Sequence, residues 1–422
     1  MFEQTTRQML DFIEKSPSCF HVVKNVADML EAAGFIRLSE EDRWDIRKGG
    51  KYFTTRNGSS LIAFNIPADG GNGCRIIASH SDSPCFKIKE NPEIAVENCY
   101  VKLNVEKYGG MLCAPWFDRP LSVAGRVVVK EDGRLTAKPV NVDRDLFVIP
   151  SLAIHMNREA NNGQQYNVQK DLLPLYGDFS AKDTFMTLIA DTAGVGKEDI
   201  LAHDLYLYNR VRGCIWGADN AFVSSARLDD LQCAFSTLQG FLQGSKEKYA
   251  AVYCVLDNEE VGSETRQGAA SAFLYDTWMR VNESLGGSYE DYVRSLSKSF
   301  LISADNAHAV HPNAADKADP VNRPQMNGGI VIKYSANQKY CTDAMSAAFL
   351  KDLCRKAEVP YQTFTNRSDM QGGSTLGNIA TTKVTVRAAD IGLAQLAMHS
   401  PYETAGVKDA YYMVKAAKTY YE

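Results

Sequence analysis

The sequence predicts an α/β fold in which a β-rich segment interrupts a domain of alternating strands and helices. Apolar strand-like runs alternate with helix-like patterns at both ends of the 422-residue chain. Several of these runs end directly in His, Asp or Glu, at the positions where open α/β sheets bind ligands. Between residues 93 and 217 short strands and hairpin signals take over. We therefore predict one domain from residues 1–92 and 218–422, with residues 93–217 inserted in it as a second domain.

Composition limits the environment of the protein. The net charge is −5 and Lys and Arg form no runs, so nucleic acid is not an expected partner. No apolar stretch reaches the roughly 18 residues of a membrane span, and the N-terminus lacks the features of a signal peptide. The ten cysteines are scattered, with no C-x-x-C pair. We expect a cytoplasmic protein with free thiols and no membrane contact.

The first 38 residues predict two helices. Ser16-Pro17-Ser18 separates them, and apolar residues at helical spacing mark the second, which Gly34 is placed to end. The run from Leu61 to Ile66 then predicts a strand.

Metal-type ligands follow three later strand-like runs. Residues 74–79 lead into His80 and Asp82, residues 300–304 into Asp305, and residues 391–398 into His399. Because the carboxyl ends of parallel strands meet at one edge of a sheet, we expect these side chains to converge. Asp229 lies where a polar loop runs into a helix-like segment.

The most informative run, residues 250–256, precedes the adjacent carboxylates Glu259 and Glu260. Two neighbouring glutamates are costly to bury unless a cation or a proton transfer uses them. If the chain stays extended, one can bind a metal while the other faces the reacting water. By itself such a pair is more often a solvated strand end. The set comprises two histidines and several carboxylates and needs no cysteine. It is more typical of a Zn, Co or Mn site than of a structural zinc site with thiolate ligands.

The segment from 93 to 217 predicts a β-rich domain. Residues 127–129 and 134–136 flank the turn Lys130–Gly133, and residues 101–105 and 205–208 predict further strands. An insert of this kind is well placed to be a lid or an assembly element. After residue 218 the α/β pattern returns, with helices predicted around 345–353 and over 411–421.

At these residues the chain resembles the aspartyl aminopeptidase family of metallopeptidases, which use a pair of metal ions. The resemblance covers nearly the whole chain. Its motifs occur in order: Ser16–Ser18 with Phe20-His21, Gly49–Phe53, Ser79–Pro84, Ala226–Asp230, Asp257–Ser263, Ser303–His308, His311–Asn313 and Gln395–Ser400. One departure is Asp230, where the family more usually has Asn after its bridging Asp. The change removes no ligand.

The resemblance implies a three-layer, metallopeptidase-type sheet domain with an inserted lid or dimerisation domain. It also implies two divalent ions, with zinc the most expected and Co or Mn as alternatives. The implied ligands are His80, Asp229 and Asp305 for one ion, and Asp229, Glu260 and His399 for the other. Asp82 would orient the His80 ring, with the capping of a turn as the alternative. Glu259 would be the general base that takes a proton from water.

The resemblance implies roles for Lys333 and His155, and a glycine-rich loop suggests a third role. Lys333, at the end of a strand-like run, would meet an acidic substrate side chain, although a solvated strand-end lysine is the simpler alternative. The Gly372–Gly377 loop would offer backbone donors at Ser374 and Thr375. His155, within the insert, would stabilise the oxyanion in a neighbouring subunit of a tetrahedral dodecamer. A histidine that ends an apolar strand or helix is the alternative for His155.

The sequence thus predicts a metalloaminopeptidase that acts on peptides and prefers N-terminal Asp or Glu. A related dinuclear amidohydrolase, such as a deacylase, or an aminopeptidase of broader specificity is the alternative within the enzyme class. An assembly or cargo protein that keeps the fold without activity is the alternative from another class. The intact ligand set together with Glu259 argues against that second alternative.

Overall fold

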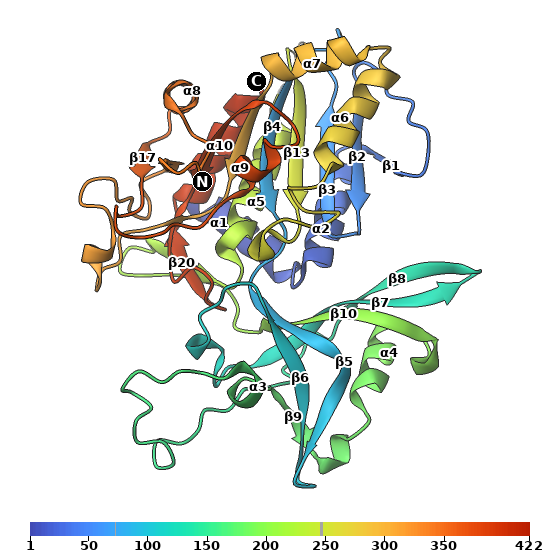
Figure 1. Ribbon diagram of the computed structural model, residues 1–422, viewed down its shortest axis with the longest axis vertical. Helices are drawn as coiled ribbons and strands as arrows, with labels where there is room; N and C mark the ends of the chain where they lie inside the picture. Colours follow the sequence, from blue (N-terminus) through green and yellow to red (C-terminus); the bar gives the residue numbers. More distant parts are fainter. Residues whose placement is uncertain (72, 245–247) are drawn as a thin grey trace. The chain divides into compact units, whose positions relative to one another are not determined.

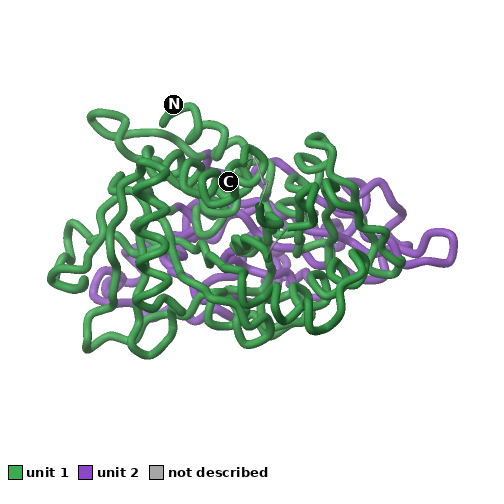
Figure 2. Tube along the Cα trace, turned by 90° about the horizontal axis from the view of Figure 1, so that it is seen from above, with its two compact units in different colours: residues 1–82, 213–398, 403–422 green, residues 83–212, 399–402 purple. Residues whose placement is uncertain are grey.

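The computed structural model describes residues 1–71, 73–244 and 248–422. The chain forms two compact units, coloured separately in Figure 2. The first contains residues 1–82, 213–398 and 403–422, and the second contains residues 83–212 and 399–402. These boundaries describe where the chain packs upon itself. The lid or assembly role of residues 93–217 stays a prediction.

A nine-stranded mixed sheet organises the first unit (Figure 1). Its order is β1 (Ile36–Leu38), β2 (Lys51–Arg56), β3 (Ser60–Asn65), β13 (Ala250–Leu256), β4 (Cys74–His80), β14 (Phe300–Ala304), β18 (Arg387–Gly392), β16 (Ile330–Lys333) and β17 (Tyr361–Phe364). The neighbours β13, β4, β14 and β18 are parallel. Their carboxyl ends therefore meet at one edge of the sheet.

Helices cover both faces of this sheet, which makes the three layers. One face packs against α1 (Phe2–Glu14), α2 (Cys19–Ala32), α5 (Leu228–Gln243), α8 (Ala344–Lys356) and α10 (Asp409–Tyr421). The other packs against α6 (Phe273–Ser284), α7 (Tyr289–Lys298) and α9 (Leu376–Ala380). Alternate residues of β13 enter different cores: Tyr253 and Val255 belong to the first, and Val252 and Cys254 to the second. The predicted α/β class is confirmed.

A smaller five-stranded sheet also belongs to the first unit. Its order is β11 (Cys214–Trp216), β12 (Phe222–Ser225), β20 (Glu403–Gly406), β19 (Ala394–Leu396) and β15 (Ala307–His308). The prediction of a single strand over residues 391–398 was wrong. The chain leaves the large sheet after Gly392, and β19 pairs with β15 and β20 instead.

The second unit is an antiparallel sheet. Its order is β8 (Arg134–Asn141), β7 (Leu121–Glu131), β10 (Ile200–Asn209), β5 (Cys85–Val96), β6 (Tyr100–Tyr108) and β9 (Leu175–Asp178). The helix α4 (Phe185–Ala193) contributes to its core, and α3 (Val168–Asp171) is a single turn. The predicted hairpin is confirmed, with Asp132 and Gly133 both at positive φ between β7 and β8.

The remaining helical segments are short 3₁₀ turns: η1 (Ala114–Trp116), η2 (Phe179–Ala181), η3 (Lys197–Asp199), η4 (Glu259–Val261) and η5 (Ala315–Lys317). All ten cysteines are free thiols. Within the described ranges, no helix has both the length and the apolar character needed to cross a membrane.

Candidate metal centre and active site

Three neighbouring strands of the large sheet bring ligand-type residues to one place. His80 is the last residue of β4, Asp305 follows the end of β14, and Glu259 and Glu260 follow β13. The strands are parallel and in register, with Leu256 of β13 opposite His80. Every residue of β13 and β14 is buried. Buried strands thus fix the backbone on which the candidate site is built.

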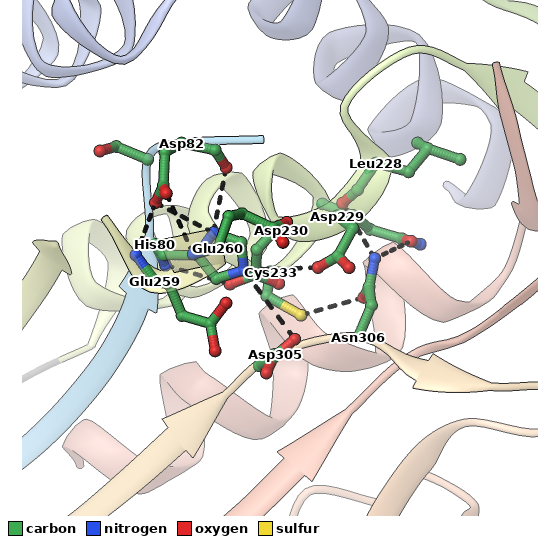
Figure 3. Close-up of polar contacts among 12 residues, drawn as sticks. His80, Asp82, Leu228, Asp229, Asp230, Cys233, Glu259, Glu260, Asp305 and Asn306 are labelled. Carbon is green, nitrogen blue, oxygen red and sulfur yellow. Dashed lines mark hydrogen bonds and ion pairs between the residues drawn. The ribbon is translucent and has the colours of Figure 1, made fainter. Parts of the chain in front are cut away.

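Asp229 reaches the same place from the start of α5. Its carboxylate Oδ1 lies 3.4 Å from His80 Nε2, and Asp305 Oδ1 lies 4.0 Å from the same nitrogen (Figure 3). The backbone N–H of Asp229 donates to Glu403 Oε2 at 3.0 Å. Glu403 is only 2% exposed, so a buried carboxylate holds the first turn of α5 in position.

The two glutamates lie on η4 and not on an extended strand. The chain turns at Asn258, whose φ is 63°, directly after β13. The expectation that strand alternation would separate Glu259 from Glu260 was therefore wrong. A helical turn directs neighbouring side chains apart by rotation about its axis, so the two glutamates still have different surroundings.

Asp82 holds this turn against β4. Its Oδ1 accepts the backbone N–H of Glu259 and its Oδ2 accepts that of Glu260, each at 3.2 Å. The His80 ring nitrogen Nδ1 lies 3.0 Å from the backbone carbonyl oxygen of Asp82 and 3.5 Å from its Oδ1. Asp82 therefore contacts both the histidine ring and the backbone that carries both glutamates.

The electrostatics of this cluster suit a cation. Burial opposes protonation of His80, yet the carboxylates of Asp229 and Asp82 raise its pKa well above the ordinary value. Burial raises the pKa of Glu259 to about 8 and that of Asp305 to about 6, and neighbouring carboxylates contribute. The pKa of Glu260 is raised by the same causes. Carboxyl groups that resist ionisation together mark a site short of positive charge, which divalent ions would supply.

Lys333 lies at the end of β16 and is 2% exposed. Its ammonium donates to the backbone oxygen of Asn306 at 2.7 Å and lies 3.7 Å from Asp305 Oδ2. Burial disfavours the charged form, but Asp305 acts together with Tyr340, Asp390 and Asp229, and the net effect raises the Lys333 pKa. Lys333 is therefore a buried cation beside a candidate metal ligand.

The remaining predicted site residues lie on three other parts of the chain. Thr375 is buried and its hydroxyl donates to Asp390 Oδ1 at 2.5 Å, while the Ser374 hydroxyl bonds to the Asn378 side chain. His155 lies in an exposed irregular stretch of the second unit. His399 falls in that unit's short stretch 399–402, at φ 67°. The roles of these four residues stay predictions.

Two buried residues of the site escaped the sequence analysis as functional residues. Glu403 holds Asp229, and Asn306 holds Lys333 through its backbone oxygen. The Asn306 side chain donates to Leu228 O and to Gln395 Oε1, each at 2.9 Å. Asn306 follows the predicted ligand Asp305 directly, and this position in the sequence could have marked it as a site residue. Glu403 offered no signal beyond its closeness in sequence to His399.

A buried cluster of His and carboxylates at the carboxyl ends of neighbouring parallel strands is typical of a metal-dependent hydrolase. The chain belongs to the aminopeptidase I zinc metalloprotease family (M18), whose model matches residues 12–421. The predicted family and the predicted metalloaminopeptidase activity are confirmed.

Similar proteins support this membership over the full length. A probable M18 family aminopeptidase 2 of Clostridium acetobutylicum is 46% identical, with 98% of each chain covered. The structure of an Ape4 and Nbr1 complex contains a chain that is 36% identical with a TM-score of 0.96, over 100% of this chain and 86% of that one. The mApe1 dodecamer of S. cerevisiae is 27% identical with a TM-score of 0.87, over 99% of this chain and 96% of that one.

Proposed function

We propose that the protein removes the N-terminal residue of peptides, with a preference for Asp and Glu, and that it does so with two divalent ions. One observation carries the proposal. Ligand atoms of His80, Asp229, Asp230 and Asp305 lie within 4.8 Å of one another, and so do those of His80, Glu259 and Glu260. These residues come from four separate segments, so the convergence is a product of the fold.

The proposed ligands of one ion are His80, Asp229 and Asp305. Those of the other are Asp229, Glu260 and His399. Zinc is the proposed metal, in keeping with the family description. When bound, the ions would lower the pKa of a bound water molecule and polarise the scissile carbonyl.

Glu259 is the proposed general base. Its carboxyl group is held by η4, whose backbone Asp82 fixes, and its pKa is raised to about 8 chiefly by burial. A base works best when its pKa is close to the working pH, and neighbouring cations would bring this value down towards neutrality. Glu259 takes a proton from the attacking water and delivers it to the amine that leaves.

Lys333 is the proposed partner of an acidic substrate side chain. It is a buried, charged residue beside Asp305, so a substrate carboxylate that reaches it would form an ion pair shielded from water. The backbone at Ser374 and Thr375 would offer further donors to the substrate.

We extend the proposal to assembly. His155 would stabilise the oxyanion in a neighbouring subunit, with residues 93–217 as the lid or dimerisation domain of a tetrahedral dodecamer. Leu152, Ile154 and Met156 around it are 55%, 45% and 75% exposed, and exposed apolar side chains in one stretch favour a protein contact. The ten free thiols favour a cytoplasmic location.

The test is a rate survey of the zinc-reconstituted protein. Chromogenic amides of Asp, Glu, Leu and Ala are compared with N-acetylated Asp and N-acetylated Leu. The proposal predicts the highest kcat/KM for Asp and Glu amides and no release of acetate from the acylated compounds. Equal rates for Leu and Asp would remove the acidic preference, and hydrolysis of the acyl group would make the protein a deacylase.

A further inference from the structure

We propose that Lys333 is an internal competitor of the metal ion, because both draw on the carboxylate of Asp305. The inference rests on the proposed function for the identity of Asp305 as a ligand. The inference adds that metal occupancy determines how strongly the Lys333 charge can attract a substrate carboxylate.

The two oxygens of Asp305 have different neighbours. Oδ1 lies 4.0 Å from His80 Nε2, on the side of the metal-type cluster, and Oδ2 lies 3.7 Å from Lys333 Nζ. The side chain of Lys333 is 3% exposed and that of Asp305 is 11% exposed, so water screens neither charge well. One carboxylate thus stands between a buried ammonium and the place proposed for a dication.

Asp305 supplies the closest carboxylate to Lys333 among the described residues. Of the described residues, Asp305 alone places a carboxylate oxygen within 4.0 Å of its ammonium. The nearby Asp390 is already engaged, because its Oδ2 accepts the backbone N–H of Cys341 at 2.6 Å and its Oδ1 accepts the Thr375 hydroxyl. The Tyr340 ring, 5.4 Å from the ammonium, adds a weaker attraction.

Lys333 is also confined. A Cβ atom added to Gly392 would lie 3.0 Å from Lys333 Cε and 2.1 Å from the backbone oxygen of Asp305. Only glycine fits between these two groups. Together with the 2.7 Å hydrogen bond to Asn306, this packing holds the ammonium beside Asp305.

The consequence is a reciprocal linkage. A dication that draws on Asp305 leaves the Lys333 charge less compensated, so a substrate carboxylate becomes a better partner for it. By thermodynamic necessity an acidic ligand at Lys333 must then favour the bound ion. The protein without its metal ion would therefore bind an acidic substrate more weakly than the metal-loaded protein does.

The test measures zinc affinity, not turnover. Metal-stripped wild type, Lys333→Met and Lys333→Arg compete with a chromogenic chelator for zinc at pH 8, and Lys383→Gln is the control for loss of an exposed charge. Lys333→Met should bind its tighter-held zinc about tenfold more strongly than wild type, since a repelling unit charge has gone. Lys333→Arg and Lys383→Gln should stay near wild type. Equal or weaker zinc binding by Lys333→Met overturns the proposal.

Removing Lys333 leaves a buried carboxylate unpaired, which can prevent folding of the metal-free variant. In that case Lys333→Met is folded with zinc present, and the rate at which it loses zinc to excess chelator is measured. Slower loss than in wild type supports the competition, and equal or faster loss overturns it. Asp and Leu amides tested on the same loaded variant report separately on the proposed function. Tighter zinc with an unchanged Asp-to-Leu ratio would leave the competition standing and refute Lys333 as the specificity residue.

Discussion

Glu259 is the residue on which the proposed chemistry depends most. Glu259→Gln keeps the size and hydrogen-bonding capacity of the side chain but cannot take a proton. We expect both ions to remain and kcat to fall by roughly 10²–10⁴-fold, the usual contribution of a positioned base. Elemental analysis and steady-state kinetics check this, with the exposed neighbour Glu264→Gln as control. Near-normal turnover in metal-loaded Glu259→Gln would remove Glu259 from the mechanism.

His21 should make the stability of the protein depend on pH. Burial lowers its pKa to about 4, with help from the charges of Arg227 and Lys24, so the folded protein holds it neutral. An unfolded histidine titrates near 6.5. Below that pH the unfolded chain takes up a proton that the folded one refuses, so stability falls as pH drops from about 6.5 to about 4.

The comparison with His21→Gln isolates this effect. Between pH 7.5 and pH 5 wild type should lose about 2 kcal/mol more of its unfolding free energy than His21→Gln loses. Urea unfolding of the metal-free proteins at the two pH values measures it. Parallel losses in both proteins would show that His21 is not held neutral.

Most residues of the cluster could be predicted because they lie at the ends of strand-like runs in the sequence. His80, Asp305 and the Glu259–Glu260 pair each follow an apolar run that is recognisable in the sequence. Glu403 could not be predicted, because its link to Asp229 is a contact between β20 and the start of α5 that no local pattern records. The buried state of Lys333 was likewise hidden, since it depends on Gly392 and Asn306 from other segments.

At the scale of elements, the hydrogen bonds from the η4 backbone to Asp82 should hold this turn in place. Asp82→Ala removes the acceptor of the Glu259 and Glu260 backbone N–H groups. Loss of hydrogen bonds to a buried charged group costs roughly 1–3 kcal/mol. We expect lower denaturation midpoints, reduced zinc content and reduced kcat in Asp82→Ala. The exposed Asp69→Ala should behave like wild type, and the same result for Asp82→Ala would show that the turn needs no anchor.

Element type was predictable where periodicity is strong and less so where the chain changes partners. The helices α2, α8 and α10 and the β7–β8 hairpin follow from spacing and turn chemistry. The chain between β18 and β19 remains apolar while it moves from one sheet to another, so composition suggested one strand. The η4 turn was missed for a related reason: its backbone is fixed by Asp82, which follows the end of another strand, β4.

At the scale of the whole molecule, the proposal makes activity a property of the assembly. His155→Ala should assemble and hold zinc but lose roughly 10²–10³-fold in kcat, as expected for loss of an oxyanion donor. Mixed oligomers of His155→Ala and Glu259→Gln should regain part of the activity, because some sites would combine an intact base with an intact His155. A fully active isolated monomer, or no recovery in verified mixed oligomers, would refute the shared site.

The central claim is that two ions, held by a cluster from separate segments, make this fold an aminopeptidase. Zinc titration of the metal-stripped protein, with bound zinc and Asp-amide hydrolysis followed together, tests it most directly. We expect activity to rise to a plateau at two zinc ions per subunit, and we expect Asp229→Ala to bind less zinc and to stay inactive. Full activity without zinc, a plateau at one ion, or two tightly held ions in Asp229→Ala would contradict it.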